Sequence, residues 1–170
     1  MKINQIMSKP AITCRSCDML SSAAQLMWEH DCGAIPVVND DGRVVGMITD
    51  RDICMSVYLQ GFTPYAIPVS SAMSEQVFSS HADDTLDAAE RLMSEKQIRR
   101  IPVVDKDNRP IGVVSLNDIA LYAASARKKD GLDHEVTQTL AAICQHRAQP
   151  QTAKKPRRKT RAKQAQAVAI

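Results

Sequence analysis

The chain contains one segment twice. Residues 7–53, shifted forward by 66 positions, align without a gap with residues 73–119, and about a third of the 47 pairs are identical. A tandem repeat of this kind predicts two copies of one supersecondary unit, each hiding an apolar face against its twin. It also predicts two equivalent clefts related by a pseudo-twofold axis, each able to take a small ligand.

The size and composition indicate a small globular protein. At 170 residues there is room for one ordinary domain, or for two very small ones that share a core. Only 4% of the residues are aromatic, so aliphatic side chains must fill that core. No apolar run approaches the roughly 20 residues that cross a bilayer, and the N-terminal residues lack the apolar stretch of a signal peptide. We therefore expect a cytoplasmic protein without a membrane segment.

The five cysteines do not form a recognisable framework. Cys14 and Cys17 are spaced C-x-x-C, as in a redox pair or half of a zinc site, but no second pair of Cys or His ligands accompanies them. His30 and His81 do not occupy matching positions in the two copies. We favour unpaired thiols, which mostly behave as small hydrophobic side chains.

The positive net charge of the chain comes from its C-terminal tail. Residues 154–163 carry seven Lys or Arg, nothing after Glu135 is acidic, and the rest of the chain holds 15 basic against 19 acidic residues. Such a run either attracts nucleic-acid phosphates or only keeps the protein soluble. The tail has no aromatic side chain and no helical pattern, which favours the solubilising role. We expect residues 149–170 to be disordered and residues 132–148 to form an extra helix.

The periodicity predicts an α/β fold in which each copy reads strand, helix, strand, strand, helix. In copy one the expected elements are a strand over Ala11–Cys14, a helix over Ser16–His30, a strand over Gly33–Val38, a turn over Asn39–Gly42, a strand over Arg43–Ile48 and a helix over Asp50–Gln60 capped by Thr49. In copy two they are 77–79, 84–96, 98–104, 105–108, 110–114 and 116–127. Pro36 suggests an edge strand or an irregular start. The expected domains are residues 3–60 and 73–127, joined by a linker over 61–72.

Each copy closes on the motif G-h-h-[ST]-x-x-D, at Gly46–Asp52 and Gly112–Asp118. The hydroxyl and the free N–H groups of a first helical turn can meet an oxyanion, and a carboxylate one turn later can accept two hydrogen bonds from a ribose diol. The alternative is a capping box, in which the hydroxyl caps the helix and the carboxylate complements its dipole. The two interpretations can both hold. Nothing in the sequence looks like a catalytic constellation, a metal cluster or a P-loop.

The repeat resembles the cystathionine β-synthase (CBS) domain, and the pair resembles a Bateman module. The resemblance covers about residues 3–126 and rests on the closing motifs and on three further matches: Ile6-Met7-Ser8 with Ala72-Met73-Ser74, Leu26-Met27 with Leu92-Met93, and Ile35-Pro36-Val37-Val38 with Ile101-Pro102-Val103-Val104. It implies a non-enzymatic regulatory protein that binds adenosine-containing ligands such as AMP, ADP, ATP, S-adenosylmethionine or NAD-type molecules. It also implies a flat homodimer, for which Ile53–Leu59 and Ile119–Tyr122 are the candidate contacts, and a protein partner that responds to the ligand.

The resemblance further implies clefts that mix the two copies. One pocket would combine Met47, Thr49 and Asp52 with Val77, Arg99 and Arg100, and its mirror Val113, Ser115 and Asp118 with Ala11, Gly33 and Ala34. Arg51 could serve the other cleft from across the axis. Because arginine grips phosphate with a planar fork, we expect the Asp52 pocket to be the better phosphate site. The alternative for Arg99 and Arg100 is a solvated pair at a strand start.

Three other functions compete with a nucleotide-binding module. A nucleic-acid-associated protein would use residues 154–163 as its contact and the repeats as its regulator. A degenerate pair would serve only for dimerisation, and the intact Asp52 and Asp118 argue against this. An enzyme comes last.

Overall fold

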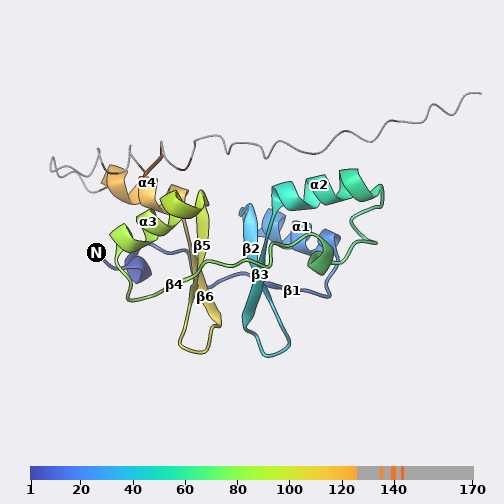
Figure 1. Cartoon of the computed structure of the whole chain (residues 1–170), viewed down its shortest axis with the longest axis horizontal. Helices are drawn as coiled ribbons and strands as arrows, with labels where there is room; N and C mark the ends of the chain where they lie inside the picture. The colour runs from blue at the N-terminus through green and yellow to red at the C-terminus, as the bar shows by residue number, and fades with distance from the viewer. Residues whose placement is uncertain (126–134, 136–138, 141–142, 144–170) are drawn as a thin grey trace, which may run out of the picture.

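The computed structural model describes residues 1–125 together with residues 135, 139, 140 and 143 (Figure 1). The extra helix expected over 132–148 therefore lies largely outside the described residues. Of its length only the four single positions are described, and these are helical. The tail over 149–170 lies wholly outside the described residues.

The fold is α/β and consists of two βαββα units, as the repeat predicts. The first unit comprises β1 (Cys14–Arg15), α1 (Leu20–Glu29), β2 (Ala34–Val38), β3 (Val44–Thr49) and α2 (Asp50–Gln60). The second unit comprises β4 (Ser80–His81), α3 (Leu86–Lys96), β5 (Arg100–Val104), β6 (Pro110–Ser115) and α4 (Leu116–Ser125). Two short 3₁₀ turns, η1 (Ile3–Gln5) and η2 (Val69–Ser71), precede the units.

The first strand and first helix of each unit begin later than the sequence predicts. The strands expected at 11–14 and 77–79 lie at Cys14–Arg15 and Ser80–His81. The Asp18 carboxylate accepts a hydrogen bond from the Arg15 N–H at 2.7 Å, and Asp84 does the same for His81. These aspartates stabilise a turn between strand and helix, so the residues before Leu20 and Leu86 are not helical.

Each unit contains a three-stranded sheet in which the second strand is central and pairs parallel with the first and antiparallel with the third. Pro36 therefore lies in a central strand, which corrects the expectation of an edge. Its partner in β3 is Met47, whose backbone N–H and carbonyl bond to Ser74. Because Met47 directs its backbone groups away from β2, the missing N–H of Pro36 interrupts no bond between the two strands.

The buried residues form two clusters, one in each unit, and not the single shared core that the repeat suggested. The clusters are mostly aliphatic, as the low aromatic content requires. Each also contains residues from a segment outside the βαββα unit that it fills. Ile3 is fully buried in the second unit, and Ile67 and Val69 are fully buried in the first. The chain's opening residues thus complete the second unit, and the expected linker completes the first.

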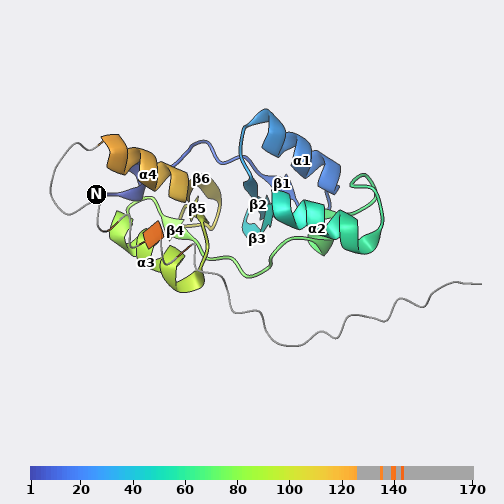
Figure 2. The same ribbon diagram turned by 90° about the horizontal axis from the view of Figure 1, so that it is seen from above.

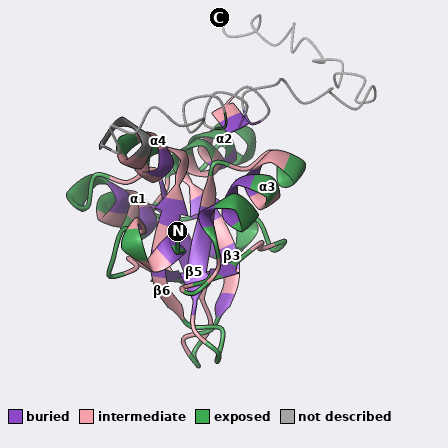
Figure 3. Cartoon of the chain, turned by 90° about the vertical axis from the view of Figure 1, so that its left-hand side faces the viewer, coloured by how far each residue is buried: buried purple, intermediate pink, exposed green. Residues whose placement is uncertain are grey.

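The two units lie side by side, with the hairpins β2–β3 and β5–β6 next to each other and the helices to the outside (Figures 1 and 2). Figure 3 shows the buried strands at the centre and exposed residues on the helices and hairpin tips. Ser8 exchanges backbone hydrogen bonds with Val113, and Ser74 does so with Met47. A Cβ at Gly112 would come within 2.8 Å of the Ser8 carbonyl oxygen. The glycine of the closing motif therefore permits the segment around Ser8 to cross from one unit to the other close to β6.

No helix within the described part of the chain is long and apolar enough to cross a membrane.

Candidate functional site

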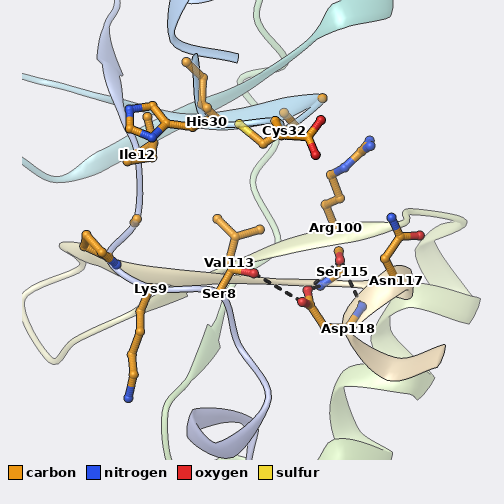
Figure 4. Close-up of a pocket in the computed structure, with 16 residues that line it drawn as sticks. Ser8, Lys9, Ile12, His30, Cys32, Arg100, Val113, Ser115, Asn117 and Asp118 are labelled. Carbon is orange, nitrogen blue, oxygen red and sulfur yellow. Dashed lines mark hydrogen bonds between the residues drawn. The ribbon is translucent and has the colours of Figure 1, made fainter. Parts of the chain in front are cut away.

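A pocket of about 450 Å³ lies between the two units, within the range of about 300–1,000 Å³ typical of small-molecule sites. Three stretches of chain and one strand residue form its wall (Figure 4). They are the crossing segment Ser8, Lys9, Pro10, Ala11 and Ile12, the entry to β2 at His30, Asp31, Cys32, Gly33, Ala34 and Ile35, the end of β6 and start of α4 at Val113, Ser115, Asn117 and Asp118, and Arg100. Both repeats therefore contribute to one pocket.

Asp118 and Ser115 form a closed set of hydrogen bonds at the start of α4. Asp118 Oδ2 accepts from the Ser115 N–H at 2.7 Å and from the Ser115 hydroxyl at 2.5 Å, and the Asp118 N–H donates to Ser115 Oγ at 3.3 Å. The Ser8 hydroxyl donates to Asp118 Oδ1 at 3.2 Å. The carboxylate is held in a fixed direction at the pocket wall, and its oxygens can each accept more than one hydrogen bond.

Thr49 and Asp52 repeat the same arrangement at the start of α2, where a complete capping box is present. The capping interpretation of the closing motif is therefore correct for both copies. It does not exclude a ligand, because the cap uses Asp52 Oδ2 and no hydrogen bond within the described residues reaches Asp52 Oδ1.

Arg100, which the sequence argument grouped with Asp52, lines the pocket of Asp118. It stands directly opposite Ser115 across β5 and β6. Residues opposite each other in an antiparallel pair lie on the same face of the sheet. The half-buried Arg100 is thereby brought to the end of the pocket that holds Ser115 and Asp118. The argument that the Asp52 pocket is the better phosphate site loses one of its two arginines.

The other predicted residues lie partly in the wall of the Asp118 pocket and partly outside it. Ala11, Gly33, Ala34 and Val113 lie in the wall of the Asp118 pocket, as expected. The predicted residues outside that wall are Met47, Thr49, Asp52, Val77, Arg99 and Arg51. Among these, Arg99 and Arg51 are exposed and Val77 is half-buried.

The pocket has a polar end and a more apolar end. In Figure 4, Ser115, Asn117, Asp118 and Arg100 lie at one side, while Ile12 and His30 lie at the other. Ile12 and Pro10 add apolar surface to the wall, together with Val113. Sequence reasoning missed nine of the wall residues: Ser8, Lys9, Pro10, Ile12, His30, Asp31, Cys32, Ile35 and Asn117. The signal for Asn117 was available, because it follows Ser115 within the closing motif.

The cysteines differ in their surroundings. Cys14 packs in the core of the first unit, and burial raises the pKa of its thiol to about 12. Cys17 is exposed. Burial also raises the pKa of the Cys32 thiol in the pocket wall, an effect opposed by the Ala34 N–H and by the charge of Arg100. Within the described residues, no three His, Cys, Asp or Glu side chains gather as a metal ion would require.

Relatives of the chain were found in sequence and in structure. The chain is 42% identical over 106 residues to the CBS domain-containing protein YhcV of Bacillus subtilis, a match covering 62% of this chain and 74% of YhcV. It is 33% identical over 127 residues to hypoxic response protein 1 of Mycobacterium tuberculosis, covering 75% and 82% of the two chains.

One similar solved structure is the CBS domain pair of protein MJ0100, in complex with 5′-methylthioadenosine and S-adenosyl-L-methionine. It superimposes with a TM-score of 0.68 at 29% identity, covering 75% of this chain and 98% of that one. The CBS domain family matches residues 3–58 and 69–125 of this chain. The protein therefore belongs to the CBS domain family, as a tandem pair of CBS domains.

Proposed function

We infer that the protein is a non-enzymatic regulatory module that binds an adenosine-containing ligand in the Asp118 pocket and signals to a partner protein. The observation that carries this proposal is the pocket itself, in which both repeats supply walls and polar groups gather at one end. A ligand that touches both repeats can bias their relative arrangement, which is the elementary requirement of a regulatory module.

The chemistry of the wall suits a nucleoside. The Asp118 carboxylate, fixed by the Ser115 cap, can accept hydrogen bonds from the two hydroxyls of a ribose. The apolar surface of Pro10, Ile12 and Val113 offers a place for a purine ring. That a solved CBS pair binds two adenosine compounds supports the same class of ligand for this chain.

Calorimetric titration of the wild type, Asp118→Ala and Asp52→Ala with AMP, ATP, S-adenosylmethionine and 5′-methylthioadenosine tests the proposal. Asp52→Ala is a matched control, because Asp52 makes the same cap in the other repeat. Losing the hydrogen bonds from a ribose diol to a carboxylate should cost about 1.5–3 kcal/mol, or at least about tenfold in affinity. For S-adenosylmethionine and 5′-methylthioadenosine we expect this loss for Asp118→Ala and a smaller one for Asp52→Ala. Equal, negligible losses would mean that both motifs are caps only.

We also propose that the protein is a homodimer. Met55, Tyr58 and Leu59 are 43%, 77% and 72% exposed on α2, at a spacing that puts them on one helical face. An apolar stripe of this kind on a small domain is typical of an association surface.

A further inference from the structure

We propose that the Asp118 pocket selects adenosine ligands whose 5′ group carries both positive and negative charges over those with a phosphate chain, through the opposed charges of Asp50 and Arg100 beside Gly33. S-Adenosylmethionine, whose 5′ group carries a sulfonium cation and ends in an amino acid, represents the favoured class. This inference rests on the proposed function and specifies the ligand of that site.

Gly33 lies between the two charges. A Cβ built at Gly33 would be 2.9 Å from Asp50 Oδ2 and 3.0 Å from Arg100 Nη2. Gly33 and Arg100 line the pocket, whereas Asp50 lies just outside its wall with one carboxylate oxygen against Gly33. The carboxylate and the guanidinium are therefore both within reach of one small group bound next to Gly33. In the described part of the chain they form no ion pair with each other, so each retains capacity for a ligand.

The backbone fixes the position of the Asp50 carboxylate. The Asp50 N–H donates to the Gly33 carbonyl oxygen at 3.3 Å, which holds the start of α2 against the entry to β2. Asp50 Oδ1 accepts from the Arg51 N–H at 2.7 Å. Its other oxygen, Oδ2, is the one that faces Gly33.

The 5′ group of the ligand should lie at this end of the pocket. Asp118, the expected ribose partner, shares the polar end with Arg100, while the more apolar wall lies on the other side (Figure 4). With the purine on the apolar side, the 5′ carbon of the ribose is carried toward Arg100. A phosphate chain there gains Arg100 but meets the like charge of Asp50. An amino acid offers a carboxylate to Arg100 and an ammonium to Asp50.

The mirror cleft lacks this pairing. The 66-residue repeat replaces Gly33 with Arg99, Asp50 with Leu116 and Arg100 with Ala34. At the equivalent places the Asp52 side therefore keeps one arginine and loses the carboxylate. The two clefts differ in charge, mixed at Asp118 and basic at Asp52, so phosphate chains should prefer the second.

The test compares ligands and variants in an Asp52→Ala background, which isolates the Asp118 pocket. S-Adenosylmethionine, ATP and 5′-methylthioadenosine are titrated calorimetrically into the Asp50→Asn and Arg100→Gln variants. Asp87→Asn is the matched control, because Asp87 is also an exposed acid in the first turn of a helix. Circular dichroism confirms that each variant is folded.

Asp50→Asn should weaken S-adenosylmethionine binding by about three- to tenfold, the effect of one partly solvated charge. It should leave 5′-methylthioadenosine, which has no charged 5′ group, unchanged, and should not weaken ATP. Arg100→Gln should weaken both charged ligands, and Asp87→Asn should change none.

An Asp50→Asn variant with an unaltered ratio of S-adenosylmethionine to ATP affinity would overturn this inference. If Asp118→Ala still abolished binding of all three ligands, the proposed function would nevertheless stand. Absence of binding of every ligand to the wild type would overturn both.

Discussion

Replacing Ile3 by alanine should destabilise the whole protein, although Ile3 is the third residue of the chain. Ile3 is fully buried in the hydrophobic cluster of the second unit, where Met93 and Ile119 are also fully buried. Its N–H donates to the Asp84 carbonyl oxygen at 3.0 Å, and the preceding Met1 carbonyl accepts from Leu86 at 3.0 Å. The opening residues of the chain are thus bonded to residues some 80 positions later, at the start of α3. A cavity at Ile3 therefore weakens the contact between these two segments.

The magnitude follows from the atoms removed. Ile→Ala deletes three buried carbons, worth about 0.8 kcal/mol each, and the cavity left behind brings the total to about 3–4 kcal/mol. Val69 is the equivalent residue 66 positions later and is fully buried in the first unit. Val69→Ala deletes two carbons and should cost about 2–3 kcal/mol. Tyr65→Ala, at a position 78% exposed and outside the apolar stripe on α2, should change stability by less than about 0.5 kcal/mol.

Urea denaturation followed by far-ultraviolet circular dichroism measures all three variants against the wild type. The expected order of destabilisation is Ile3→Ala, then Val69→Ala, then Tyr65→Ala. An Ile3→Ala variant as stable as Tyr65→Ala would refute the reasoning, since it would mean that the opening residues do not complete the second unit.

Three other predictions concern the closing glycines, a buried acid and the apolar stripe on α2. Gly112→Ala should lower the calorimetric melting temperature more than Gly46→Ala, because a Cβ would meet the Ser8 carbonyl oxygen at 2.8 Å in one case and the flexible Met73 Sδ at 2.7 Å in the other; equal shifts would contradict it. Burial, with the charges of Asp87 and Glu135, raises the pKa of Glu90. The protonated Glu90 therefore stabilises the folded state, and this stabilisation is lost as the pH rises through the raised pKa. Glu90→Gln should therefore raise the melting temperature at pH 7 and lose this advantage below about pH 4.3, the ordinary glutamate pKa, whereas a lower melting temperature at pH 7 would refute the assignment. Leu59→Lys should convert the dimer to a monomer in light scattering while Gln76→Lys, at another exposed position, should not, and a monomeric wild type at micromolar concentration would disprove the dimer.

Local signals explain the elements that the sequence predicted well. The helix over Asp50–Gln60 has its predicted bounds, because Thr49 and Asp52 cap its start and Gly61 adopts the left-handed conformation at its end. The turn at Gly42 has the predicted positive φ, +75°. Each of these features depends on residues within a few positions of one another.

The features that sequence reasoning missed depend on contacts between distant segments. Nothing in local periodicity indicates that Ile3 packs in the second unit or that Val69 packs in the first. The hairpin register alone does not place Arg100, since its equivalent Ala34 stands opposite Thr49 of its own repeat and yet lines the Asp118 pocket. Pairing each closing motif with the strand of the other repeat agrees with the pocket wall for Gly33 and Ala34, but it grouped Arg100 with Asp52.

The most direct test of the central claim is a crystal structure of the protein grown with S-adenosylmethionine. Our account predicts ligand density in the Asp118 pocket, with the ribose hydroxyls on the Asp118 carboxylate and the amino acid between Asp50 and Arg100. Density confined to the Asp52 cleft, or a ligand in the Asp118 pocket that leaves the Asp118 carboxylate uncontacted, would contradict it.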